Sequence, residues 1–198
     1  MRWFKWFLLI FFILPCSAAA HPHLFVENSV KVRFDAAGMT GIAVEWTFDE
    51  MFSSTMIETY DSNKDGNFSS AETEALRRKA FSNLKGYHYF TFIMIADKPF
   101  NVQYIRDFEA RIKDHKIIYA FFVPCHVKAT VRERKVTIAI YDETYYTDIL
   151  LVSSQCDHTP APKAVTSTIL KFENFDKNYY FGQIAPVEII VNFRKASP

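Results

Sequence analysis

Residues 61–72 carry oxygen-bearing side chains at alternate positions, which is the spacing that a calcium-binding loop requires. The candidate ligands, in chain order, are Asp61, Asn63, Asp65, Asn67, Ser69 and Glu72. The first three would contribute side-chain oxygens, the fourth its backbone carbonyl, the fifth an oxygen directly or through water, and the last both oxygens of its carboxylate. Calcium takes six to eight oxygen ligands, so these residues can complete its coordination shell. The sequence therefore predicts one Ca²⁺ site in this loop.

The same loop resembles the EF-hand family over residues 48–84. Gly66 stands where such a loop turns sharply, and Phe68 stands at its apolar anchor position. Apolar residues recur at intervals of four on both sides, which predicts a helix before and after the loop. EF-hands usually occur in pairs, and the sequence contains no second loop, so the resemblance implies a structural site filled by ambient calcium and not a calcium sensor. The alternative is a polar connection between two helices that binds no ion.

The first twenty residues have the composition of a cleavable signal peptide. Arg2 and Lys5 precede an apolar run at residues 6–14, and small residues end the segment. This run is shorter than the roughly 20 residues that span a bilayer. We therefore expect a periplasmic protein with no stable membrane span after cleavage. Residues 21–198 would then form a single β-rich domain.

Two histidines lie at the expected start of the mature chain. Cleavage after Ala20 would leave His21 as the first residue, with His23 two positions later. A free amine and two imidazoles within three residues form a nitrogen-rich set that suits Zn²⁺, Ni²⁺, Co²⁺ or Cu²⁺. The alternative is that both are ordinary polar residues at a frayed terminus. The histidines that could complete a metal site are His88, His115, His126 and His158.

Cys125 and Cys156 are the two cysteines that remain after cleavage. An even pair in an oxidising compartment predicts a disulfide between them. A metal site is the alternative, because His126 follows the first cysteine directly and His158 lies two residues after the second.

Several function classes are disfavoured by the sequence. With 23 basic and 22 acidic residues, the formal charge of +1 does not favour a nucleic-acid partner. The sequence contains no motif that matches a nucleophile elbow, a phosphate-binding loop or a zinc-protease helix. A copper-dependent monooxygenase also uses an amino-terminal histidine, but nothing else here identifies an oxygen-activating site. We therefore expect a protein that is not an enzyme.

The pattern of apolar residues indicates a mainly β fold with an α insertion. Alternating apolar residues at 30–34 and 42–48 predict a hairpin. Further β-type runs are 90–95, 117–123, 127–131, 136–141 and 187–193. The predicted architecture is a β-sheet or sandwich, interrupted at about 48–84 by the helix, loop and helix.

Four segments together resemble the family catalogued as domain of unknown function 1007, namely residues 21–26, 41–50, 61–72 and 141–146. Members of this family are secreted bacterial proteins, often labelled periplasmic components of ABC-type transport systems, and some are linked to nickel and cobalt transporters. The resemblance implies a metal-binding accessory protein of a transition-metal transport system, with an inner-membrane metal transporter as its partner. A calcium-stiffened envelope module for protein interactions is the alternative from another class.

Overall fold

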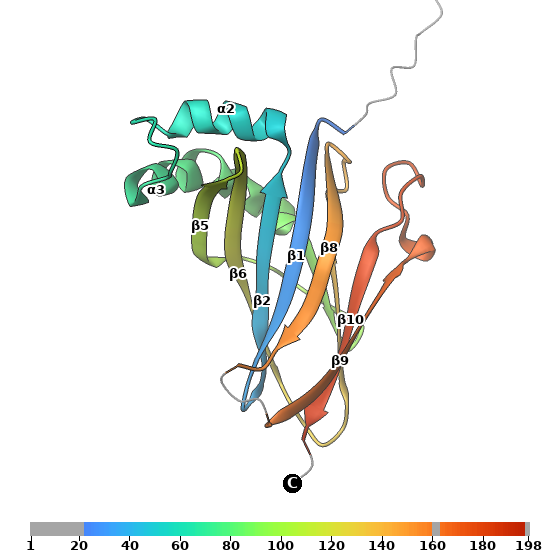
Figure 1. Cartoon of the computed structure of the whole chain (residues 1–198). Helices are drawn as coiled ribbons and strands as arrows, with labels where there is room; N and C mark the ends of the chain where they lie inside the picture. The colour runs from blue at the N-terminus through green and yellow to red at the C-terminus, as the bar shows by residue number, and fades with distance from the viewer. Residues whose placement is uncertain (1–21, 160–162, 197–198) are drawn as a thin grey trace, which may run out of the picture.

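The chain folds mainly into β-strands, as predicted. The computed structural model describes residues 22–159 and 163–196, and these contain two five-stranded sheets (Figure 1). The strands are β1 (Leu24–Asp35), β2 (Gly38–Phe48), β3 (Thr91–Ile95), β4 (Lys98–Phe100), β5 (Arg106–Lys113), β6 (Lys116–Lys128), β7 (Arg134–Ile140), β8 (Thr147–Asp157), β9 (Val165–Glu173) and β10 (Val187–Lys195).

The first sheet has the strand order β5-β6-β2-β1-β8. β1 and β2 form the predicted hairpin, in which Val30 pairs with Val44. The turn between them is held by Asp35, whose carboxylate accepts hydrogen bonds from the backbone N–H groups of Ala37 and Gly38. β8 joins β1 in parallel, so this edge is closed by a strand from much later in the chain. Alternation in β1 and β2 places one face of the hairpin in the core.

The second sheet has the strand order β4-β3-β7-β10-β9, and its neighbouring strands are antiparallel. Its inward side chains share one hydrophobic core with those of the first sheet. Phe34 of β1 meets Phe193 of β10 edge to face, with 5.1 Å between ring centroids. The sandwich prediction is thus matched by two sheets around a common core.

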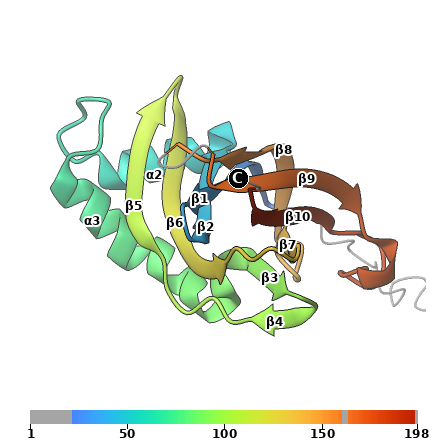
Figure 2. The same ribbon diagram turned by 90° about the horizontal axis from the view of Figure 1, so that it is seen from below.

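The α-helices of the described residues occur where the insertion is predicted. α2 (Glu50–Tyr60) and α3 (Ser70–Lys79) are followed by the 3-10 segment η2 (Phe81–Phe90), and a short turn, η3 (Phe175–Lys177), precedes β10. α2 contacts β6 and α3 contacts β5, and Figure 2 shows both helices beside these strands, on the side of the molecule away from β9 and β10. No helix in the described ranges is long and apolar enough to cross a bilayer.

Some strand boundaries differ from the prediction. Residues 117–123 and 127–131 were expected as two strands, but a single strand, β6, runs through Pro124. Pro124 lies opposite Gly41 beside an irregularity in the β2–β6 register, where a missing backbone N–H is tolerated. The prediction also omits β4, β5, β8 and β9, and each of these is an edge strand.

Candidate metal sites and an apolar cavity

The 61–72 loop joins the end of α2 to the start of α3. Asp61 caps α2 through its backbone N–H, which donates to the Ile57 carbonyl oxygen at 2.9 Å. Ser69 caps α3, and its hydroxyl accepts a hydrogen bond from the backbone N–H of Glu72. Phe68 is half-buried and packs against the hydrophobic core. Helix caps therefore fix both ends of the loop, and the ring of Phe68 anchors it to the hydrophobic core.

The Asp61 carboxylate organises the first half of the loop. One of its oxygens accepts from the backbone N–H of Asp65 at 3.2 Å, and the other accepts from that of Gly66 at 3.0 Å. Gly66 has a φ of +78°, a left-handed conformation that strongly favours glycine. Asp61 is only 4% exposed, so its charge is held inside the turn by these donors.

The Glu72 carboxylate joins the two ends of the loop. One oxygen accepts from the hydroxyl and the backbone N–H of Ser62, at 2.6 and 2.8 Å. The other accepts from the hydroxyl and the backbone N–H of Ser69, at 2.8 and 2.9 Å. These bonds, with that of the Ser62 hydroxyl foremost, lower the pKa of Glu72 from 4.5 to about 2. Glu72 is therefore ionised at neutral pH and acts as a clasp between residues 62 and 69.

The oxygen donors of the loop fit calcium in their chemistry, but they are engaged within the protein. Asn63, Asp65 and Asn67 are exposed, and the carboxylate of Asp65 accepts hydrogen bonds from the other two. Residues 22–159 and 163–196 hold no group of three or more histidine, cysteine, aspartate or glutamate side chains placed to bind one metal ion. Calcium binding in this loop would therefore require Glu72 to exchange its serine partners for the ion.

His23 immediately precedes β1 and is exposed. Its backbone N–H donates to the carbonyl oxygen of Tyr146 at 2.9 Å, and its ring lies 5.1 Å from that of Tyr146. His21, the other predicted ligand, lies outside the described residues.

The remaining histidines are dispersed in the structure. His88, His115 and His126 are exposed, and the Nδ1 atom of His88 lies 3.4 Å from the Val102 carbonyl oxygen. His158 is half-buried, stacks on a phenylalanine ring and forms a 2.8 Å hydrogen bond with a serine hydroxyl. None of them belongs to a metal-binding group of three or more such side chains with His23, so the described part of the chain does not identify a further ligand.

The predicted disulfide is wrong for this structure, in which Cys125 and Cys156 are both free thiols. Cys125 lies on β6 and Cys156 on β8, and β2 and β1 separate these two strands. Three strand spacings amount to about 14 Å, whereas a disulfide needs Cα atoms within about 7 Å. Burial raises the pKa of Cys125 to about 12 and also raises that of Cys156.

The alternative metal site around these cysteines is not assembled either. Cys125 is buried, whereas the adjacent His126 is exposed because neighbouring side chains on a strand point to opposite faces. Cys156 on β8, with His158 directly after the end of that strand, is separated from Cys125 by the same two intervening strands.

The sequence did not predict a cavity of about 520 Å³ between the first sheet and the helices. Its wall is mainly apolar and includes Trp46 and Phe48 from β2, Phe52 and Met56 from α2, and Tyr119 from β6. The regular spacing of these residues marks them as core, and only the three-dimensional arrangement shows the space left between them. The mouth includes Tyr146, the residue that holds His23.

Asp142 stabilises the loop at this mouth. Its carboxylate accepts hydrogen bonds from the backbone N–H and the hydroxyl of Thr144, at 2.9 and 2.7 Å, and from the Thr147 backbone N–H at 3.1 Å. The loop is therefore an Asx-type turn that leads into β8.

Comparison with known proteins identifies relatives without an assigned activity. The chain is 27% identical over 138 residues to "Uncharacterized 15.5 kDa protein in trpE 3'region" of Spirochaeta aurantia, which covers 70% of this chain and 98% of that protein. It is 25% identical over 142 residues to an "Uncharacterized protein" of Haemophilus influenzae, which covers 70% of this chain and 66% of that protein. A family model described as "Protein of unknown function (DUF1007)" matches residues 6–171. The match spans most of both sheets and the whole helical insertion, and the chain belongs to this family.

Proposed function

We propose that this protein is a periplasmic metal-binding accessory protein of a transition-metal transport system, with a structural calcium ion in the 61–72 loop. The observation that carries the first part of the proposal is the position of His23. Its backbone is fixed to Tyr146, while its imidazole remains exposed. A metal bound by His23, His21 and the terminal amine would be displayed at the rim of the sandwich, where a partner protein can reach it. An inner-membrane metal transporter is the partner that this arrangement suits.

The transition-metal site can be tested by calorimetry on a chain that begins at His21. We expect one site for at least one of Zn²⁺, Ni²⁺, Co²⁺ and Cu²⁺, and loss of that site in His23→Ala. His115→Ala is the matched control, because it removes an exposed imidazole from the turn between β5 and β6. A chain with one extra alanine before His21 should bind more weakly, because its amine is displaced. Equal affinity of wild type and His23→Ala for all four metals would refute the proposal.

Growth measurements connect the site to transport. A deletion strain should grow poorly when zinc, nickel or cobalt is scarce, and wild-type protein should restore growth. The His23→Ala variant should be exported to the same level without restoring growth. If it restores growth fully, the histidine is not needed for the cellular role.

The calcium part rests on the geometry of the 61–72 loop. Asp61 and Gly66 form a tight turn between two capped helices, and most side chains of the loop carry an oxygen atom that could coordinate Ca²⁺. Extracellular calcium modules bind with dissociation constants of about 0.1–1 mM. At about 10 mM calcium, such a site would stabilise the protein by roughly 1.4–2.7 kcal/mol, if the unfolded chain does not bind the ion.

The measurement is the melting temperature in calcium and in chelator. We expect calcium to raise it for wild type and for Glu74→Gln, the matched control, because Glu74 lies on the exposed side of α3 and bonds to Arg77. The increase should disappear in Glu72→Gln. An unchanged increase in Glu72→Gln would show that any calcium is bound elsewhere.

The interaction-module alternative is favoured by one observation on the outer face of the first sheet. Phe25, Leu150 and Val152 lie on the adjacent strands β1 and β8 and are 51%, 61% and 46% exposed. A Leu150→Lys, Val152→Lys double variant separates the two functions. If it binds metal normally and supports growth under metal scarcity, this face is not required for transport; if it binds metal and fails, a protein contact is part of the function.

A further inference from the structure

We propose that the cavity between the first sheet and the helices binds an amphipathic monocarboxylate, with its hydrocarbon part among the aromatic side chains and its carboxylate beside Lys79. This inference is independent of the metal sites, because it uses none of their residues.

The size and the wall of the cavity suit a small apolar molecule. Its volume of about 520 Å³ is within the range of about 300–1,000 Å³ that is typical of small-molecule sites. Side chains from β1, β2, α2, η2 and β8 enclose it, including Leu24, Phe48, Met56, Leu84 and Ile149. Burial of hydrocarbon against such a wall is favourable because it removes apolar surface from water.

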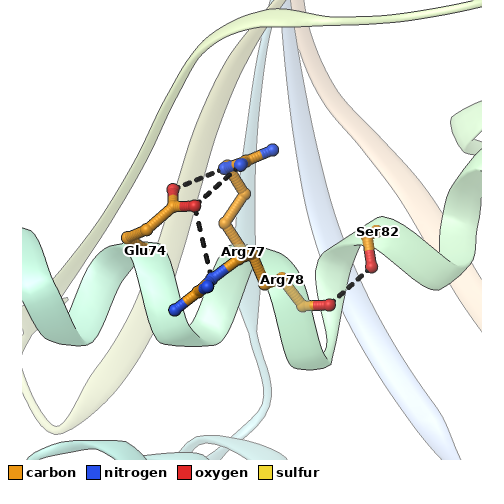
Figure 3. A network of polar contacts seen from close by, with 4 residues as sticks. All are labelled: Glu74, Arg77, Arg78 and Ser82. Atoms are coloured by element: carbon orange, nitrogen blue, oxygen red, sulfur yellow. Dashed lines mark hydrogen bonds and ion pairs between the residues drawn. The ribbon is translucent and has the colours of Figure 1, made fainter.

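The charge at the cavity comes from Lys79, at the end of α3. α3 ends in three consecutive basic residues, and Figure 3 shows that Glu74 lies between the first two, Arg77 and Arg78. Its carboxylate bonds to Arg77 at 2.7 and 2.8 Å and pairs with Arg78 at 3.4 Å. Lys79 is exposed and lines the cavity, and no carboxylate of the described chain lies within 4.0 Å of its ammonium group.

The one carboxylate that lines the cavity does not neutralise this lysine. Asp142 is 4% exposed and accepts its hydrogen bonds from Thr144 and Thr147. The cavity therefore combines an apolar wall with one cation whose charge is not paired. A ligand with one negative charge and a hydrocarbon body matches both properties.

Two polar atoms without partners belong to aromatic residues of the cavity wall. The Nε1 atom of Trp46 and the hydroxyl oxygen of Tyr119 are buried and have no hydrogen-bond partner, and their side chains are 2% and 3% exposed. Buried polar groups in proteins are nearly always paired. Neither atom is reached by solvent in the free protein, so a ligand oxygen would contact them only if the aromatic wall opens on entry. Because the ring of Trp46 lines the cavity, a ligand bound there should change the surroundings of this residue.

This change provides the test. Trp3 and Trp6 precede the expected cleavage site, so a chain that begins at His21 contains Trp46 as its single tryptophan. We expect decanoate, titrated below its micelle concentration in chelator, to cause a saturable change in Trp46 fluorescence and a matching calorimetric isotherm. Ala80→Phe, which places a phenyl ring at the cavity wall where the hydrocarbon chain would lie, should abolish both signals while the circular dichroism spectrum is retained. If Ala80→Phe does not fold, Leu84→Gln serves as the substitute test. It makes the wall polar at similar volume and should weaken decanoate binding.

Lys79→Met tests the orientation of the ligand. It should weaken decanoate binding by roughly three- to tenfold and leave the binding of the uncharged decanol unchanged. Lys85→Met is the matched control, because Lys85, on η2, is exposed like Lys79 but does not line the cavity. Absence of a saturable signal, or undiminished decanoate binding in a folded Ala80→Phe protein, would overturn the proposed site. Equal decanoate affinity in Lys79→Met and wild type would overturn the role of the lysine.

Discussion

Replacement of Ser53 by alanine should weaken the attachment of α2 to the first sheet. Ser53 is fully buried on α2, and its hydroxyl oxygen accepts a hydrogen bond from the backbone N–H of Ile117 at 2.9 Å. The same hydroxyl donates to the carbonyl oxygen of Phe48 at 3.4 Å. In Ser53→Ala the N–H of Ile117, a fully buried residue near the start of β6, has no acceptor.

The expected magnitude follows from this lost acceptor. A buried N–H left without a partner costs about 1–3 kcal/mol. For a domain of this length, each kcal/mol lowers the melting temperature by roughly 2–4 °C, so the total decrease should be roughly 2–12 °C. Ser54→Ala is the matched control, because Ser54 is exposed on the same helix. Its effect on the free energy of unfolding should be within about 0.5 kcal/mol.

The assay is urea unfolding followed by Trp46 fluorescence, in chelator so that bound calcium does not contribute. Trp46 packs against Phe48, the residue whose carbonyl accepts from Ser53, so its emission reports on this junction. Equal unfolding free energies for Ser53→Ala and Ser54→Ala would refute the reasoning. That result would also remove the support for the position of α2, and hence for the cavity wall that Phe52 and Met56 form.

Three further perturbations follow from single residues. The pKa of Glu72 is lowered from 4.5 to about 2, so the stabilisation from its ionised form is complete above pH 4.5 and is lost as the pH falls towards 2. In chelator, the difference in unfolding free energy between wild type and Glu72→Gln should therefore be constant at neutral pH and decrease over that acidic range; an increase on acidification would contradict it. Cys125, with a pKa of about 12, should not react with Ellman's reagent in the folded protein at pH 8, whereas the half-buried Cys156 should react slowly and both should react in denaturant. A chain beginning at His21 that shows no thiol in denaturant would restore the disulfide. Gly41→Ala should destabilise the protein by more than about 1 kcal/mol, because Gly41 has a φ of +154° and an added Cβ would collide with the Val123 carbonyl oxygen. Gly86→Ala, where an added Cβ meets nothing within 4 Å, is its control, and equal unfolding free energies would count against this geometry.

Interior strands were predictable from the sequence and edge strands were not. β1, β2 and β10 alternate clearly because one face of each is packed against the opposite sheet. β5 and β9 lie at sheet edges, and most of their side chains are exposed, so charged and polar residues occur on both faces and the alternation is weak. β8 shows the same effect, and its parallel pairing with β1 depends on a contact between segments more than 100 residues apart in the chain.

Among the candidate sites, too, those formed by residues close together in the sequence were predictable and those formed by distant residues were not. The 61–72 loop could be proposed from sequence because its donors are local and their spacing is fixed by the turn. The cysteine pair could not be judged, since only the strand order shows that β2 and β1 separate Cys125 from Cys156. The cavity also depends on contacts that the sequence does not show. The sequence shows three consecutive basic residues, and only the structure shows that Glu74 pairs with the other two and leaves Lys79 without a carboxylate partner.

The helical insertion connects the calcium loop to the cavity, and this predicts a measurable coupling between them. α2 presents Phe52 and Met56 to the cavity and is capped by Asp61, while α3 carries Glu72 in its first turn and Lys79 at its end. A calcium ion that draws Glu72 away from Ser62 and Ser69 would shift α3 relative to α2, and Lys79 would move with its helix. If calcium changes the affinity for decanoate by some factor, decanoate must change the affinity for calcium by the same factor, because coupling between binding sites is reciprocal. Calorimetric titration of each ligand, with and without the other, measures both factors. If both ligands bind and both factors equal one, the calcium loop and the cavity are not coupled, and the predicted movement of α3 does not affect ligand binding.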